Sequence, residues 1–154
     1  MNYQAHMSAA AQGFAPRLLS YNRHGAIVQH CQPAKPSLEE ASDFMARLHR
    51  ARLCFDTQIP HQTNTCITGV HSDLNPGNWV WLPNGTLGAI DWDYAGMASA
   101  DWDLAVFAVE WKLEAEQIQT LLSAYYFASI APEQFEKSLK AARTVIEQWQ
   151  PNQT

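Results

Sequence analysis

Charged residues are scarce in this sequence of 154 residues, at 16% against 47% hydrophobic residues. Lys and Arg number 10 and Asp and Glu 15, so the formal net charge is −5. Because no basic cluster is available to meet a phosphate backbone, we expect no binding to nucleic acid. The hydrophobic share excludes a disordered chain, and the length predicts one folded domain.

Cysteines and long apolar runs are scarce as well. Cys31, Cys54 and Cys66 are an odd number without CxxC spacing, so we expect free thiols rather than a disulfide or a metal site. No apolar run approaches the roughly 20 residues that cross a bilayer. The segment Met1 to Gln12 lacks the basic start and apolar core of a signal peptide. We therefore expect no membrane association and a cytoplasmic protein.

The first third of the chain predicts one helix and one hairpin. Tyr3 to Gln12 is rich in alanine and predicts a helix that ends before Gly13. Two short apolar runs follow, 17–21 and 26–32, separated by Asn-Arg-His-Gly. Since Asn and Gly tolerate the positive φ of a tight turn, this pattern indicates a β-hairpin. Residues 33–36, which begin and end with proline, read as a linker.

The clearest helical signal begins at Ser37. Its hydroxyl can cap the first turn, and Glu40 three residues later completes a capping box. Phe44 and Leu48 then recur at a spacing of four, which gives an apolar stripe as far as Leu53.

The second half predicts one more hairpin and then helices. Apolar runs at 78–82 and 86–90 flank Pro-Asn-Gly, and this hairpin would bring Asn78 and Asp91 close together. Beyond it the pattern is helical over three stretches: Trp102 to Trp111, Glu114 to Ser129 and Pro132 to Trp149. The order, a little β and then mostly α, predicts an α+β fold.

A dense group of polar residues lies in the segment VHSDLNPGN, which spans 70–78, and in IDWD, which spans 90–93. Phosphoryl transfer needs a carboxylate that orients the attacking hydroxyl, and Asp73 suits this task. It also needs oxygen ligands for Mg²⁺, and Asn78 with Asp91 suit that one. By itself, Asp91-Trp92-Asp93 also fits the Asp-x-Asp of a metal-dependent glycosyltransferase, but that reading leaves His-x-Asp-x-x-x-x-Asn unexplained.

The order His-x-Asp-x-x-x-x-Asn, hairpin, Asp resembles the aminoglycoside phosphotransferase and choline kinase superfamily, and most of all its choline, ethanolamine and thiamine kinase-like branch. The resemblance covers roughly residues 14–111 and is carried by VHSDLNPGNW, IDWDYAG and DWDLAVFAVEW. The helix end MARLHRARL also resembles the helix that precedes the catalytic loop in that family. The resemblance implies a protein-kinase-like fold and an ATP-dependent phosphotransferase that acts on a small hydroxyl-bearing molecule such as choline, thiamine or an aminoglycoside.

The resemblance also implies roles for individual residues. Asp73 would be the catalytic base, and His71 a structural member of the catalytic loop. Asn78 and Asp91 would hold Mg²⁺. Asp103 would be a buried brace that accepts hydrogen bonds from the loop backbone.

Two further assignments follow from the same resemblance. Asp93 would either touch a second metal ion or hydrogen-bond locally. The backbone of His30, Cys31 and Gln32 would form the hinge that meets the adenine ring.

Aromatic residues gather around this motif. Most are expected in the core, because Trp buries a large apolar area. The alternative is a partial aromatic and acidic box for a cationic substrate, with Glu110 as its acid. The aromatic residues concerned are Trp79, Trp92, Tyr94, Trp102 and Trp111.

Two features of a complete kinase of this kind are missing. The sequence contains no G-x-G-x-x-G segment, and no lysine occurs before Lys35. The expectation is a partial small lobe over 1–36 followed by a large catalytic lobe over 37–154, with an uncovered cleft that favours self-association. Two hypotheses stay open: a small-molecule kinase, with activity reduced by the missing parts, or a non-catalytic remnant that binds a nucleotide or a protein.

Overall fold

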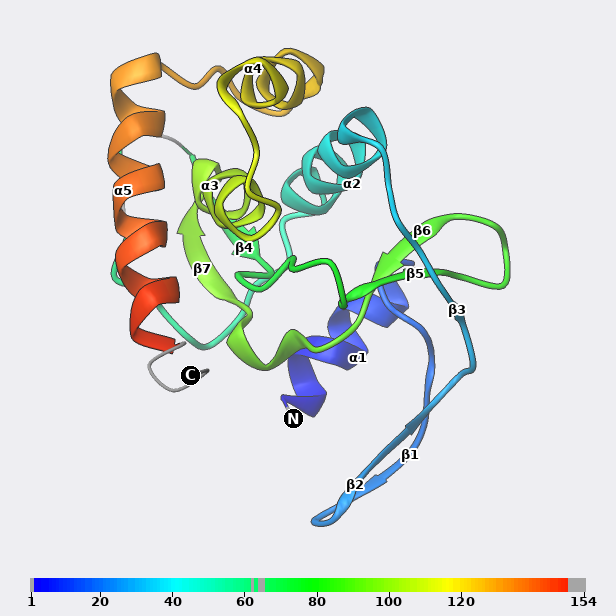
Figure 1. Cartoon of the computed structure of the whole chain (residues 1–154). Coiled ribbons are helices and arrows are strands. Elements are labelled where there is room, and N and C mark those ends of the chain that lie inside the picture. Colours follow the sequence, from blue (N-terminus) through cyan, green and yellow to red (C-terminus); the bar gives the residue numbers. More distant parts are fainter. Residues whose placement is uncertain (1, 62, 64–65, 150–154) are drawn as a thin grey trace.

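A computed structural model describes residues 2–61, 63 and 66–149, and its first part contains the predicted helix and hairpin. The helix α1 spans Tyr3–Ala11, and the antiparallel strands β1 and β2 span Leu18–Asn22 and Gly25–Val28. The hairpin projects away from the helices of the second half (Figure 1). Leu19, Tyr21 and Ile27 on it are each more than half exposed. Self-association through this surface stays a prediction.

The remaining elements alternate short strands with longer helices. The helix predicted for 114–129 ends at Ala124, because Tyr125 leaves the helical backbone with ψ 119° and turns its ring into the core. None of the described helices is long and apolar enough to cross a bilayer. The elements are β3 (Gln32–Pro33), α2 (Leu38–Arg50), β4 (Ile67–Val70), β5 (Trp79–Trp81), β6 (Leu87–Ala89), the 3-10 helix η1 (Trp92–Tyr94), β7 (Gly96–Ser99), α3 (Asp101–Glu110), α4 (Ala115–Ala124) and α5 (Pro132–Trp149).

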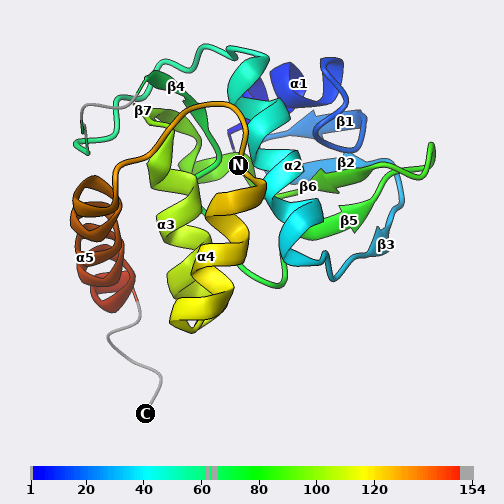
Figure 2. The same cartoon turned by 90° about the horizontal axis from the view of Figure 1, so that it is seen from above.

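The helix α2 lies at the centre of the fold. The predicted capping box is present, since Ser37 Oγ accepts from the Glu40 N–H while the Glu40 carboxylate accepts from the Ser37 N–H. The apolar stripe is buried, with Phe44 and Leu48 fully covered. Figure 2 shows β1, β2, β5 and β6 on one side of α2 and the helices α3, α4 and α5 on the other.

Two small sheets hold the site segments. The predicted second hairpin is β5–β6, and β3 pairs with its outer edge to make a three-stranded sheet. The pair β4–β7 was not predicted; its register runs from Ile67 opposite Ser99 to Val70 opposite Gly96. In the segment 56–64, predicted to be a loop, Gln58 bridges Met97, while residues 62 and 64 lie outside the described residues. The strand β4 ends at Val70 and leads directly into residues 71–78, called the loop below.

An aromatic chain joins α2, β5 and α3. Phe44 packs edge-on against Trp79 at a centroid distance of 5.0 Å, and Trp79 packs edge-on against Phe107 at 5.9 Å. Phe107 in turn stacks on Trp111 at 4.9 Å. Trp79 directly follows Asn78, so burial of this indole fixes where the Asn78 backbone lies. As expected from the sequence, Trp79, Trp92 and Trp102 are core residues.

Gly69 in β4 offers the sharpest test of this packing. A Cβ at this position would lie 2.3 Å from the Leu53 carbonyl oxygen and 2.9 Å from the Phe55 ring. We expect Gly69→Ala to destabilise the protein by about 1–3 kcal/mol, because backbone cannot yield as a side chain can. Chemical denaturation monitored by tryptophan fluorescence measures this change.

Gly88→Ala is the matched control for this prediction. Its Cβ would lie 2.8 Å from Leu82, but from atoms of a flexible side chain that can turn aside. An equal loss of stability in the two variants would contradict the assigned role of the Leu53 backbone.

Candidate active site

The loop begins where β4 ends, and the buried carboxylate of Asp103 on α3 holds it in place. Asp103 Oδ2 accepts from the His71 N–H at 2.9 Å, and Oδ1 accepts from the Ser72 N–H at 2.7 Å. Burial alone would raise the pKa of Asp103, but hydrogen bonds from His49 and from the His71 backbone outweigh it and hold the pKa below its usual value. The contacts expected of a brace are therefore present.

His71 ties the loop to the end of the second hairpin. Its Nε2 lies 2.9 Å from the Ile90 carbonyl oxygen, and its Nδ1 accepts from the Asp73 N–H at 3.2 Å. These partners assign the proton to Nε2. Burial lowers the pKa of His71, which keeps the ring neutral and in this tautomer. His71 thus serves as a spacer between Asp73 and the residue that precedes Asp91.

The Asp73 side chain is oriented by two amides. Asn75 Nδ2 donates to its Oδ1 at 2.9 Å, and Asn78 Nδ2 donates to its Oδ2 at 3.0 Å. Asn78 Nδ2 also donates to the Asp73 carbonyl at 2.7 Å. A carboxylate that accepts from two amides has further lone pairs, one of which can accept a hydroxyl proton.

Asn78 and Asp91 are neighbours across the hairpin, as predicted. The Ile90 N–H donates to the Asn78 carbonyl at 2.9 Å, and Asp91 follows in the left-handed region at φ 60°. Both N–H groups of the Asn78 amide face Asp73, which leaves Oδ1 as its remaining polar atom. The described residues contain no group of three or more His, Cys, Asp or Glu side chains that could hold a metal ion together. One carboxylate and one amide oxygen nevertheless fit Mg²⁺, which keeps waters and phosphate oxygens for its other positions.

The remaining sequence-predicted residues lie at the edges of this group. Asp93 is exposed and accepts a hydrogen bond from the N–H of Asn2, the cap of α1. The predicted hinge residues His30 and Cys31 lie between the β1–β2 hairpin and the β3–β5–β6 sheet. Burial raises the pKa of the Cys31 thiol. Gln32 already pairs with Trp81 in the β3–β5 ladder. The structure therefore brings Asp73, His71, Asn78 and Asp91 together and leaves the hinge residues apart from them.

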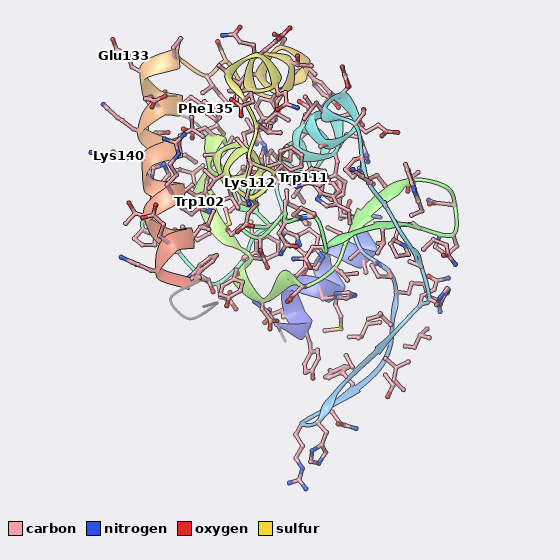
Figure 3. The ribbon with its side chains drawn as sticks, viewed as in Figure 1. Trp102, Trp111, Lys112, Glu133, Phe135 and Lys140 are labelled. Carbon is pink, nitrogen blue, oxygen red and sulfur yellow. The ribbon has the colours of Figure 1, made fainter. Side chains whose placement is uncertain are left out.

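Two indoles hold the loop at a point that the sequence did not single out. Trp79 Nε1 and Trp111 Nε1 both donate to the Leu74 carbonyl, at 3.3 and 3.0 Å. Trp111 and its neighbour Lys112 follow the end of α3 (Figure 3). Glu110, which precedes Trp111, has its pKa raised by burial and by the nearby charge of Asp73. A second carboxylate thus lies close to Asp73.

A buried His–Tyr pair continues the brace away from the loop. His49 Nε2 lies 3.1 Å from Asp103 Oδ2 and carries a proton, because a carboxylate can only accept. The Tyr125 hydroxyl lies 2.6 Å from His49 Nδ1, and burial raises the pKa of Tyr125. His49 lies in the segment MARLHRARL, which carries part of the family resemblance, but nothing in the sequence points to Tyr125, which lies 76 positions away.

A cavity of about 420 Å³ adjoins the loop on the side of α5. Ser72 forms part of its wall, one residue before Asp73, and Asp93 forms another part, two residues after Asp91. Trp102, on the side of α3 that faces α5, also lines it (Figure 3). The other walls come from residues 57–61, from Tyr94 and from the second half of α5 through Ala141, Val145, Gln148 and Trp149.

Comparison with known proteins places this geometry in a family. Residues 55–136, more than half of the chain, match the sequence model of the Phosphotransferase enzyme family (APH). The chain belongs to this phosphotransferase family. The matched segment includes Asp73, Asn78, Asp91 and Asp103. Comparison with curated protein sequences gives no match.

Solved structures show that the phosphotransferase has a protein-kinase-like fold. A choline/ethanolamine kinase family protein from Mesorhizobium loti aligns with a TM-score of 0.72 at 16% identity, over 97% of this chain and 71% of that one. LicA, the choline kinase from Streptococcus pneumoniae, was solved in complex with AMP. It aligns with a TM-score of 0.67 at 17% identity, over 96% of this chain and 70% of that one. An aminoglycoside-3'-phosphotransferase of type VIII aligns with a TM-score of 0.64 at 14% identity, over 90% of this chain and 78% of that one. At these identities the likeness establishes the fold alone.

The brace predicts how stability depends on pH. We expect Asp103→Asn to lower the free energy of unfolding by about 3–5 kcal/mol. The amide has one acceptor oxygen in place of two, so buried donors around it lose their partner. The lowered pKa of Asp103 means that its ionised form stabilises the folded state above the unfolded pKa of about 3.9. This stability is lost as the pH falls through the folded pKa. Denaturation from pH 7 to pH 2 measures it.

The exposed Asp43, which pairs with Arg47 at 2.8 Å, provides the control. Asp43→Asn should change stability by less than about 1 kcal/mol. If Asp103→Asn kept the acid sensitivity of the wild type, the Asp103 carboxylate would not be its source.

Proposed function

We propose that this chain transfers the γ-phosphoryl group of ATP to the hydroxyl of a small molecule. The observation that carries the proposal is the placement of Asp73. Its carboxylate is oriented by Asn75 and Asn78 in a loop tied to Asp103, one residue from the wall of a cavity large enough for a small molecule. Family membership supports the reaction class.

In the proposed step the acceptor hydroxyl oxygen forms a bond to the γ-phosphorus. The bond between that phosphorus and the bridging oxygen of ADP breaks, and the hydroxyl proton passes to Asp73. Because the transition state is loose, the main contribution of Asp73 is to orient the hydroxyl. The amide donors from Asn75 and Asn78 keep the carboxylate in place during this transfer.

Asn78 and Asp91 would hold Mg²⁺, which would supply positive charge against the negative charge that develops on the phosphates. Asp91 is exposed and makes no hydrogen bond or ion pair with a described residue, so its carboxylate is available. The hydrogen bond from the Ile90 N–H to the Asn78 carbonyl keeps the backbone of Asp91, the next residue, close to Asn78 across the hairpin. Asp93, held by the Asn2 N–H, is an accessory in this proposal.

The nucleotide would lie between two parts of the chain. In this proposal residues 1–36 form part of a small lobe and residues 37–154 the catalytic lobe. The backbone of the segment His30 to Gln32 connects them and would meet the adenine ring. The alignment with the AMP complex of LicA supports binding of a nucleotide by this fold.

A second function is favoured by the distribution of lysines. The first lysine of the chain is Lys35, and it is exposed beside the short strand β3. In kinases a lysine on a strand of the small lobe holds the phosphates of ATP and contributes strongly to the rate of phosphoryl transfer. The alternative function is therefore a module that binds a nucleotide without turning it over. It would use the same proposed metal site as the kinase.

Two substitutions separate these functions. We expect Asp73→Asn to lower the rate of phosphoryl transfer about 10² to 10⁴-fold, because the hydroxyl loses its proton acceptor, and to leave ATP binding intact. We expect Asp91→Asn to abolish the Mg²⁺-dependent part of ATP binding. Calorimetry with and without Mg²⁺ measures binding, and release of ADP in the presence of choline, thiamine or an aminoglycoside measures transfer.

Asp56→Asn, at an exposed carboxylate of the 51–66 segment, is the matched control and should change neither quantity. Binding that depends on Asp91 without any transfer would establish the alternative function. Absence of Mg²⁺-dependent binding in a folded sample would refute both.

Glu110 tests the charge of the acceptor. Its carboxylate and that of Asp73 form a negative pair that would attract a cationic alcohol such as choline. We expect Glu110→Gln to raise the KM for choline about tenfold and to leave the KM for a neutral alcohol unchanged. Because the pKa of Glu110 is raised above 4.5, the KM for choline should fall as the pH rises through that raised pKa.

Glu116→Gln on the exposed face of α4 is the control for charge alone. A KM that rises equally for charged and neutral alcohols would mean that Glu110 shapes the site without selecting a cation.

A further inference from the structure

Two buried hydrogen-bond donors in the cavity wall have no partner among the residues that the structure describes. They are the hydroxyl of Ser72 and the indole N–H of Trp102. Both residues are 3% exposed, and both line the cavity beside the loop. An unpaired buried donor costs about 1–3 kcal/mol, and native proteins contain few of them.

Trp102 is an exception among the indoles near the site. Trp79 and Trp111 each donate to the Leu74 carbonyl, and Trp92 donates to the Ala89 carbonyl at 3.0 Å. The chain therefore pairs the other indoles that pack around the loop and leaves unpaired the one in the cavity wall. An acceptor supplied from the cavity would satisfy Trp102 in the same way.

The walls around these donors indicate the character of the ligand. Tyr94 and Trp149 stack on each other at 4.7 Å, and Ile59 adds an aliphatic surface. The ionisable groups among the described lining residues include one carboxylate, Asp93, and one imidazole, His61, whose pKa is lowered by burial. A buried carboxylate on the ligand would find no cation here, and a polycation would find a single carboxylate, so both are disfavoured.

We infer that the cavity takes a small alcohol with an apolar or aromatic body that carries a neutral carbonyl group, whose oxygen accepts hydrogen bonds from Trp102 Nε1–H and Ser72 Oγ–H. A carbonyl oxygen has two lone pairs, which matches two donors. The inference rests on the proposed function for the alcohol: Ser72 directly precedes Asp73, the residue proposed to accept the proton of that hydroxyl. Ser72 and Trp102 thereby select the acceptor.

Binding of this ligand involves a small movement of the wall. The polar atoms of Ser72 and Trp102 are buried, and the His61 ring packs against that of Trp102 at 4.8 Å. His61 also hydrogen-bonds Ser138 on α5 at 2.9 Å. In this inference a displacement of the His61 ring would expose the indole N–H, and the new hydrogen bond to the ligand would offset the cost of that displacement.

Two uncharged probes of equal length test the inference. N-(2-hydroxyethyl)benzamide carries the carbonyl, and 4-phenylbutan-1-ol has methylene groups in place of the amide. Each is titrated into the full chain, without nucleotide, while the indole N–H signals of the six tryptophans are followed by NMR. Loss of a signal in Trp102→Phe assigns the Trp102 resonance.

The amide should move the Trp102 N–H signal downfield, and the phenylalkanol should not. Trp102→Phe and Ser72→Ala should each weaken binding of the amide about tenfold and that of the phenylalkanol less than twofold. Trp81→Phe, on β5 and away from the cavity, is the matched control and should leave both affinities unchanged. Ser72→Ala keeps the test intact if Trp102→Phe does not fold.

Several outcomes would overturn the inference. They are an unmoved Trp102 signal at saturation, equal losses of affinity for the two probes, and no binding of either probe at millimolar concentration. Phosphorylation of the amide is assayed separately with ATP and Mg²⁺. Carbonyl-dependent binding without phosphorylation would leave the assignment of Ser72 and Trp102 standing and would mean that the cavity does not present this alcohol for transfer.

Discussion

The buried carboxylate of Asp103 is the constraint on which the rest of the site depends. Its two oxygens receive N–H groups from His71, Ser72 and His49 within 3.1 Å. These donors outweigh the effect of burial and keep the carboxylate charged. A buried charge tolerates few arrangements of its partners, so the start of the loop, the end of α2 and the start of α3 are held in one geometry.

From this anchor the remaining contacts follow along the chain. His71 reaches the Ile90 carbonyl, and the indoles of Trp79 and Trp111 reach the Leu74 carbonyl. Asp73 lies between these fixed points, where Asn78 donates to it. A proposed base held by the fold in this way is oriented before the substrate arrives. The contrast with Ser72 and Trp102, whose donors have no described partner, marks the side of the loop where a ligand would complete the pairing.

Local patterns in the sequence predicted the elements that short-range forces determine. The capping box at Ser37 is made by groups three residues apart, and Pro-Asn-Gly selects the turn that sets Asn78 opposite Ile90, the residue before Asp91. The helix predicted to reach Ser129 stops at Ala124, because burial of Tyr125 beside His49 outweighs the local helical preference. The strands β4 and β7 were missed because each has only four residues and neither alternates clearly between polar and apolar positions.

The sequence by itself determined the motif residues, the family they resemble, and the neighbourhood of Asn78 and Asp91, because each depends on spacing along a few turns of chain. Only the tertiary structure decided that His49 and Tyr125 meet, that Glu110 approaches Asp73, and that a cavity opens beside Ser72. These contacts join residues that lie tens of positions apart. They depend on how the helices pack around the Asp103 carboxylate, and packing of distant segments leaves no periodic signal in the sequence.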